Sequence, residues 1–164
     1  MVQSSGKTRA MIVSALAASL LAMFAAGAVA GTAYSASYRF AKFTKDGTTI
    51  CDYQRAHVAT SGSSAQGRGY NFVRRNSGCD TQHPRPAGFL GIRSTLVHSN
   101  GTACESTGWL YNGSVGSGYD VGAYVWDDEN RCHGSVRSRA AGRAWDGDGY
   151  ITTDYVSYSP YQSW

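Results

Sequence analysis

Two aspartates near the end of the chain have the clearest capacity for metal chemistry. Asp146 and Asp148 stand one residue apart in a glycine-rich run at 145–150. Two carboxylates on such a flexible turn offer the hard oxygen ligands that Ca²⁺ accepts. The run lacks the Gly and Glu that complete an EF-hand calcium loop. A calcium site at Asp146 and Asp148, with Asp154 as a third ligand, is therefore one hypothesis, and an ordinary turn with no cofactor is the simpler interpretation.

Aromatic residues are the second group that could do chemistry, and they concentrate in the second half of the chain. Exposed Trp and Tyr rings stack on sugar rings and anchor protein interfaces. Small β domains use the same residues to fill thin cores, so core packing is the alternative interpretation. The candidate binding residues are Trp109, Tyr111, Trp126, Trp145 and Tyr150.

Groups that could form a catalytic site are sparse. The chain has four histidines and no Gly-x-Ser-x-Gly nucleophile motif. The acidic run at 127–130 is typical of a solvated hairpin tip rather than of paired catalytic carboxylates. No catalytic residue is predicted, and the protein is not expected to be an enzyme. A Ser-His-Asp site is assembled in space rather than in sequence, so a small extracellular hydrolase stays open as an alternative.

Residues 1–30 have the pattern of a secretory signal peptide. They carry Lys7 and Arg9, continue into an uncharged apolar run and end in Ala28 and Ala30, small residues at the −3 and −1 positions of a cleavage site. The alternative is an uncleaved membrane anchor, since the run approaches the roughly 17–25 residues that a span needs. Cleavage would leave residues 31–164 as a single secreted domain with no second apolar stretch, so no membrane span is expected in it.

The charge of residues 31–164 is mild. Removal of Lys7 and Arg9 leaves 13 of the 15 basic residues against 11 acidic ones. This balance is too small and too evenly spread to indicate a nucleic-acid partner. Most of the remaining bases are arginine, and together with the many Ala and Gly residues they point to a bacterial source.

The four cysteines all lie in the predicted mature chain. An even number of cysteines in an exported chain predicts disulfides rather than a metal site. Three connectivities are possible for Cys51, Cys79, Cys104 and Cys132. Cys51 and Cys79 are as far apart as Cys104 and Cys132, which favours the pairs Cys51–Cys79 and Cys104–Cys132.

The elements that must position these residues are predicted to be strands. Short alternating stretches broken by turn residues are typical of a many-stranded β domain. An Asp-Gly step at 46–47 and an Asn-Gly step at 100–101 each follow an alternating run, which predicts two hairpins. A further strand is expected at about 150–158, followed by an aromatic C-terminal tail.

The two hairpins and the equal cysteine spacing suggest a degenerate internal duplication. The sub-units would cover about 36–90 and 91–150, with the proline-rich segment 83–86 as connector. Chance recurrence of turn chemistry is the alternative. The predicted fold class is all-β, a small disulfide-stabilised sandwich or double Greek-key domain.

These features favour a secreted, non-enzymatic binding protein that acts on an extracellular protein or glycan through its aromatic residues. A secreted antibacterial, toxin-like protein is a second hypothesis. The last third of the chain is similar in texture to small secreted bacteriocins of the lactococcin-972 type, with Gly108-Trp109 early, His133 centrally and an aromatic end. That resemblance implies action on competing cells.

Overall fold

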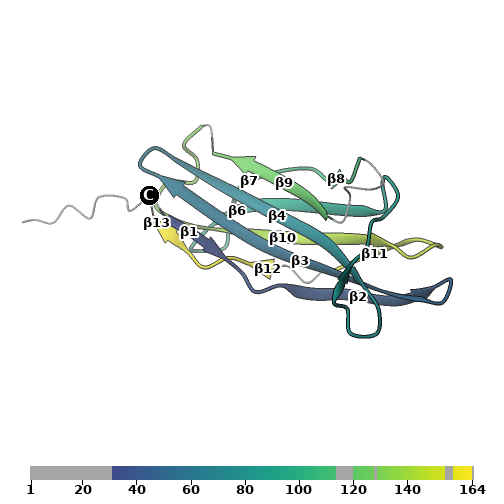
Figure 1. Cartoon of the computed structure of the whole chain (residues 1–164). Helices are drawn as coiled ribbons and strands as arrows, with labels where there is room; N and C mark the ends of the chain where they lie inside the picture. Colours follow the sequence, from purple (N-terminus) through teal and green to yellow (C-terminus); the bar gives the residue numbers. More distant parts are fainter. Residues whose placement is uncertain (1–30, 114–119, 128, 154–156, 164) are drawn as a thin grey trace, which may run out of the picture.

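The structure is a computed structural model that describes residues 31–113, 120–127, 129–153 and 157–163. The predicted signal peptide and Asp154 lie outside these residues. The described chain is all-β and forms two antiparallel sheets, which confirms the predicted fold class and takes the form of a sandwich (Figure 1). No helix in these ranges is long and apolar enough to cross a membrane.

Sheet A is built around a long hairpin. β3 (Thr48–Ser61) and β4 (Ser64–Arg75) pair along almost their whole length. The strands β1 (Gly31–Tyr34) and β2 (Tyr38–Lys45) follow each other along the outer edge of β3. On the other side of β4 lie β9 (Asp120–Trp126) and β5 (Thr81–Gln82), also end to end.

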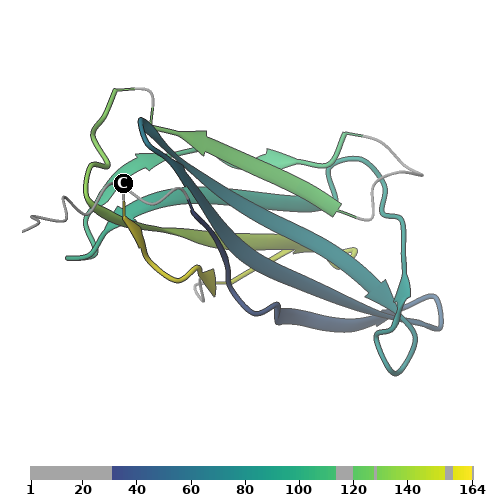
Figure 2. The ribbon, with the colours of Figure 1, turned by 60° about the vertical axis from the view of Figure 1, so that its left-hand side comes forward.

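Sheet B is centred on β6 (Leu90–His98) and β10 (Ser135–Trp145). Two short strands pair with β6, namely β7 (Ala103–Ser106) and β8 (Leu110–Tyr111). Three pair with β10, namely β11 (Tyr150–Thr152), β12 (Ser157–Tyr158) and β13 (Gln162–Ser163). The four long strands run along the length of the molecule, with β6 and β10 packed against sheet A (Figures 1 and 2).

The two sheets meet through small residues. A Cβ atom at Gly69 would lie 3.0 Å from Ile92 Cγ1 and 3.1 Å from Ala140 Cβ. Glycine at this position therefore lets β4 approach sheet B more closely than a side chain allows. The core on either side of this contact consists of small and medium aliphatic residues: Ile50, Ala56, Val58, Ala65, Val73, Leu90, Ile92, Leu96, Val121, Ala123, Val125, Val136 and Ala140.

Polar side chains also connect the sheets inside the core. Asn71 Nδ2 on β4 donates to the carbonyls of Gly91 at 2.9 Å and Arg143 at 2.7 Å, both in sheet B. Ser138 Oγ on β10 donates to the Arg68 carbonyl in sheet A at 3.3 Å. These bonds satisfy buried polar groups and fix the position of one sheet on the other.

Both predicted hairpins are present, with different turns. Asp46 (φ 49°) and Gly47 (φ 74°) form the two-residue turn between β2 and β3, with the left-handed backbone that suits strand twist. The hairpin between β6 and β7 has a longer loop. There Asn100 Oδ1 accepts the Thr102 N–H at 2.9 Å, and Gly101 has a φ of 85°.

Two disulfides join Cys51 to Cys79 and Cys104 to Cys132, the pairs that the spacing favoured, each across 28 positions. The first bridge stays within the part of the chain that forms sheet A. The second ties β7 of sheet B to the loop after β9, a strand of sheet A. The second proposed sub-unit thus contributes strands to both sheets, whereas the first contributes strands to sheet A. The internal duplication therefore stays a hypothesis.

Candidate ligand-binding surface

Four of the five predicted binding residues come together at one end of sheet B. The ring centres of Trp145 and Tyr150 are 5.1 Å apart, and those of Tyr111 and Tyr150 are 5.7 Å apart. Trp109 is linked to Tyr111 and Tyr150 by Arg143, which contacts all three side chains. Trp126 does not belong to this cluster, because it lies on β9 in sheet A, where 52% of it is exposed.

Arg143 connects the members of the aromatic cluster. Its guanidinium carbon lies 4.1 Å from the centre of the Trp109 ring and 5.9 Å from that of Tyr150. Its Nη1 donates a 3.0 Å hydrogen bond to the Tyr111 hydroxyl. A planar guanidinium can stack on a ring and donate in its own plane at the same time. Arg143 therefore gathers three aromatic side chains around one positive charge.

Arginine occupies almost every outward position along the middle of β10. Arg137, Arg139 and Arg143 alternate with buried residues, because successive side chains of a strand face opposite sides of the sheet. The remaining outward position in this stretch is Ala141, and Arg93 on β6 lies directly opposite it. Three arginines therefore surround one small residue.

The small side chain of Ala141 leaves a hollow of about 430 Å³ in the outer face of sheet B. Arg93, Arg139 and Arg143 line it. The guanidinium carbons of Arg93 and Arg143 lie 5.3 Å and 4.1 Å from the Trp109 ring centre. The other lining residues are Trp109, Thr152, Thr153 and Tyr158, so no carboxylate of the described chain faces the hollow.

Arg137 extends this surface toward the C-terminus. Its guanidinium carbon lies 4.1 Å from the ring centre of Tyr158 and 4.6 Å from that of Tyr161. At about 3.4 Å per residue, the row from Arg137 to Arg143 is about 20 Å long. The name arginine surface is used below for Arg93, Arg137, Arg139 and Arg143 with Trp109, Tyr111, Trp145, Tyr150, Tyr158 and Tyr161.

The arginine surface carries positive charge that no acid of the described residues neutralises by an ion pair. Both ion pairs in those residues belong to Arg131, with Glu105 at 3.2 Å and with Glu129. Guanidinium groups present paired donors that match carboxylate, sulfate or phosphate oxygens. The surface can therefore hold an anionic group beside aromatic rings.

The predicted calcium ligands lie in the turn between β10 and β11. Asp146 Oδ1 accepts the backbone N–H groups of Asp148 at 2.9 Å and Gly149 at 3.0 Å. These two bonds, with a smaller contribution from the charge of Lys45, hold the pKa of the Asp146 carboxyl below its usual value. Asp146 thus stabilises the turn. No cluster of three or more His, Cys, Asp or Glu that could hold a metal occurs in the described ranges, and calcium binding stays a hypothesis.

The acidic run at 127–130 differs in part from its expected solvated state. Asp127 is buried, with only 4% of its surface exposed. Its Oδ1 accepts the Arg131 N–H at 2.7 Å and its Oδ2 accepts the Cys132 N–H at 3.0 Å. The carboxylate therefore organises the loop that carries the second disulfide, because it accepts from two backbone N–H groups of that loop.

Several buried ionisable groups do not belong to the arginine surface. Asp52 points into the core, and burial raises the pKa of its carboxyl to about 7 against the opposing charge of Arg85. Arg85, in the proline-rich segment 83–86, is 3% exposed and donates to the Trp145 carbonyl. On the outer face of β3, burial, aided by Arg68 and Arg55, lowers the pKa of His57 to about 4.

The predicted binding residues include four of the six aromatic residues of the surface, and they lack Tyr158, Tyr161 and all four arginines. The available signal was the alternation of Arg137, Arg139 and Arg143 with small or apolar residues, which places them on one face of a strand. No protein-family model, curated protein or solved structure matches this chain.

Proposed function

We propose that this protein is a secreted, non-enzymatic binding protein that holds an acidic glycan on the arginine surface. The observation that carries the proposal is the hollow above Ala141, which Arg93, Arg139 and Arg143 line and in which Arg93 and Arg143 both lie against the Trp109 ring. Carboxylate, sulfate or phosphate groups of a glycan would accept from the guanidinium donors. The C–H faces of the sugar rings would pack on the aromatic side chains.

The shape of the surface favours an extended ligand. The arginine row is about 20 Å long, by the strand rise of about 3.4 Å per residue, and aromatic rings accompany it from Tyr150 to Tyr161. A polymer with repeated negative charges matches repeated cations better than a single compact anion does. The two disulfides are compatible with an extracellular setting, where such polymers occur.

The test is a comparison of acidic and neutral polysaccharides. We expect the purified secreted protein to bind polygalacturonate and dextran sulfate but not neutral dextran in isothermal titration calorimetry. Affinity should fall as salt rises, because exposed charges are screened. Trp109→Ala and Arg139→Ala should each weaken binding by roughly tenfold or more, the scale of a lost charged or aromatic contact. Trp126→Ala is the matched control and should bind like the wild type.

Three outcomes would overturn the proposal. Equal affinity for neutral dextran would remove the role of charge. An equal loss in the Trp109 and Trp126 variants would remove the role of this surface. Tighter binding of single-stranded DNA than of either acidic polysaccharide would indicate a nucleic-acid ligand instead, since stacked bases and phosphates use the same residue types.

The antibacterial and hydrolase hypotheses stay open beside this proposal. No contact between described residues favours either one. Growth inhibition of related bacteria by the purified protein would support the first. Release of new reducing ends from polygalacturonate would support the second and would show that the protein is not a simple binder.

A further inference from the structure

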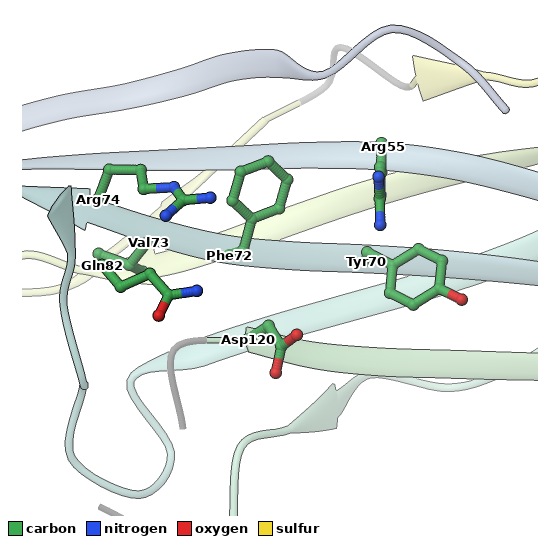
Figure 3. Close-up of a pocket in the computed structure, with 7 residues that line it drawn as sticks. All are labelled: Arg55, Tyr70, Phe72, Val73, Arg74, Gln82 and Asp120. Atoms are coloured by element: carbon green, nitrogen blue, oxygen red, sulfur yellow. The ribbon is translucent and has the colours of Figure 1, made fainter. Parts of the chain in front are cut away.

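A second hollow lies on sheet A, where two short strands meet along one edge of β4. β9 begins at Asp120, opposite Phe72, and β5 ends at Gln82, opposite Arg74. Among the described residues, Val73 between them has no strand partner on this side, and its carbonyl accepts only the N–H of His83, at 3.3 Å, just after β5. The break leaves a hollow of about 160 Å³, here called the sheet A hollow, which Val73 lines together with Arg55, Tyr70, Phe72, Arg74, Gln82 and Asp120 (Figure 3).

Three polar side chains with complementary hydrogen-bonding capacity line the sheet A hollow. The Asp120 carboxylate accepts, the Arg74 guanidinium donates, and the Gln82 amide does both. None of the three makes a side-chain hydrogen bond or ion pair within the described part of the chain. Figure 3 shows the Gln82 amide and the Asp120 carboxylate on the same side of β4, at the break between the two short strands. Their polar atoms are therefore available to a ligand.

Two aromatic rings form the apolar part of the hollow and are held by their neighbours. The Phe72 ring stacks on Tyr53 with 5.3 Å between ring centres. The guanidinium carbon of Arg55 lies 5.0 Å from the Tyr70 ring centre and 5.5 Å from that of Tyr34. These contacts restrain the rings before a ligand arrives, so less side-chain freedom is lost on binding.

We propose that the sheet A hollow binds a single neutral sugar ring that carries two adjacent hydroxyl groups. A hydroxyl both donates and accepts, so one can donate to Asp120 while its neighbour accepts from Gln82 or Arg74. The apolar edge of the ring would contact Phe72 and Tyr70. The hollow is smaller than the roughly 300–1,000 Å³ of sites that enclose drug-sized ligands, which suits one ring rather than a chain segment.

Charge separates this site from the arginine surface. In the sheet A hollow the Asp120 carboxylate lies among the same lining residues as Arg55 and Arg74, whereas no described acid accompanies the arginines of the hollow above Ala141. The two sites lie on different sheets and share no lining residue. The proposal for the sheet A hollow therefore does not depend on the acidic-glycan proposal, and each can fail alone.

The experiment uses four methyl glycosides, those of glucose, galactose, mannose and N-acetylglucosamine, with the secreted protein. Binding is measured by saturation-transfer NMR and by titration of backbone amide shifts. We expect at least one glycoside to bind and to shift amide signals of β4, β5 and β9. Asp120→Ala and Gln82→Ala should each weaken that binding at least tenfold. Trp109→Ala should leave it unchanged, and Gln82→Ala should leave binding of dextran sulfate unchanged.

Two results would overturn the proposal. Binding of none of the four glycosides by the wild type is the first. The second is binding that survives Gln82→Ala and disappears in Trp109→Ala, which would move the sugar to the arginine surface. Asp120 and Gln82 are exposed, and an unchanged urea midpoint verifies that each variant folds. If the Asp120 variant does not fold, the effect of Gln82→Ala on glycoside binding alone tests the proposed site.

Discussion

Asp52 and His57 lie on opposite faces of β3, and both are almost completely buried. Asp52 points into the core, whereas His57 points outward and stacks under the Tyr34 ring at 4.1 Å. Burial shifts their pKa values in opposite directions, to about 7 for Asp52 and to about 4 for His57. Both residues are therefore neutral over much of the mildly acidic range.

The opposite pKa shifts of Asp52 and His57 predict how the stability of the folded protein depends on pH. The folded protein holds the Asp52 proton that an unfolded chain releases above pH 3.8, so this group stabilises the fold at low pH and loses its contribution as pH rises to about 7. His57 does the opposite, because its contribution is present above pH 6.5 and is lost as pH falls to about 4. Between pH 4 and 6.5 the two slopes oppose each other.

The measurement is urea unfolding of the wild type, Asp52→Asn and His57→Phe at several pH values. Relative to the wild type, Asp52→Asn should gain stability as pH rises from 4 to 8, by up to about 4 kcal/mol at 1.36 kcal/mol for each pKa unit. His57→Phe, which keeps a ring under Tyr34, should gain relative stability as pH falls from 6.5 to 4. Parallel pH profiles for all three proteins would contradict this prediction.

Asn112 fixes the segment before β6 through three hydrogen bonds of its side chain. Oδ1 accepts the Leu90 N–H at 2.9 Å, and Nδ2 donates to the carbonyls of Arg85 at 3.1 Å and Pro86 at 2.9 Å. Asn112→Asp places a second carboxylate oxygen against two carbonyl oxygens, so we expect a loss of about 3 kcal/mol in the free energy of unfolding. Chemical denaturation measures it.

The control for this substitution is Asn100→Asp. Asn100 is exposed and uses only Oδ1, which an aspartate retains, to accept the Thr102 N–H. Its effect should stay within about 0.5 kcal/mol. Equal effects at positions 100 and 112 would show that the buried amide is not what holds this segment.

Gly69→Ala tests the close approach of the two sheets. The added methyl would lie 3.0 Å from Ile92 Cγ1 and 3.2 Å from the Arg93 carbonyl oxygen, so the sheets must move apart. We expect a destabilisation of about 1–3 kcal/mol, as for other overpacked cores. Gly62→Ala, where no atom lies within 4 Å, should change stability by less than about 0.5 kcal/mol in the same thermal-unfolding experiment. A neutral Gly69→Ala would contradict the tight contact.

Removal of either disulfide should destabilise the protein by a similar amount. Both bridges span 28 positions, and closing a loop of that length is worth about 3.5 kcal/mol in the chain-entropy account. The double variants Cys51→Ser/Cys79→Ser and Cys104→Ser/Cys132→Ser can be compared by urea unfolding. Peptide mapping without reduction is the companion measurement, and a peptide joining Cys51 to Cys104 would refute the pairing.

Arg143→Lys distinguishes stacking from charge in the arginine surface. Lysine keeps the positive charge but cannot stack in plane on Trp109 while bonding Tyr111. We expect Arg143→Lys to weaken binding of dextran sulfate several-fold. Arg139→Lys is the control, since Arg139 makes no ring contact within the described residues, and it should lose less. Equal losses would show that charge alone accounts for binding.

Much of the fold was predictable because its signals are local. The Asp46-Gly47 step specifies a turn with two positive φ angles, and alternation on either side specifies the strands. The path of β9 was not predictable in the same way. β9 pairs with β4 of sheet A, although the strands before and after it in the sequence belong to sheet B. This pairing depends on contacts between residues far apart in the sequence, such as Val125 beside Gly67, and not on turn chemistry.

The candidate surface was predictable only in part, for a related reason. Four aromatic residues were identified by type, but their convergence on Arg143 and Tyr150 depends on pairing between β6, β8, β10 and β11. Trp126 has the same chemistry as Trp109 and lies on the other sheet. Residue type therefore indicates a capacity for binding, and strand order decides which residues act together.

The small residues at the centre of the sandwich have a consequence for how this protein can change. Aromatic side chains such as Trp109 and Tyr158 lie on the outer face of sheet B, where neighbouring arginines contact their rings. A substitution of one of these arginines or aromatic residues would change the proposed binding surface and would also remove a contact between neighbouring side chains. If the arginine surface binds the proposed acidic glycan, a change of ligand would therefore need pairs of substitutions, one to alter binding and one to restore the lost contact between side chains.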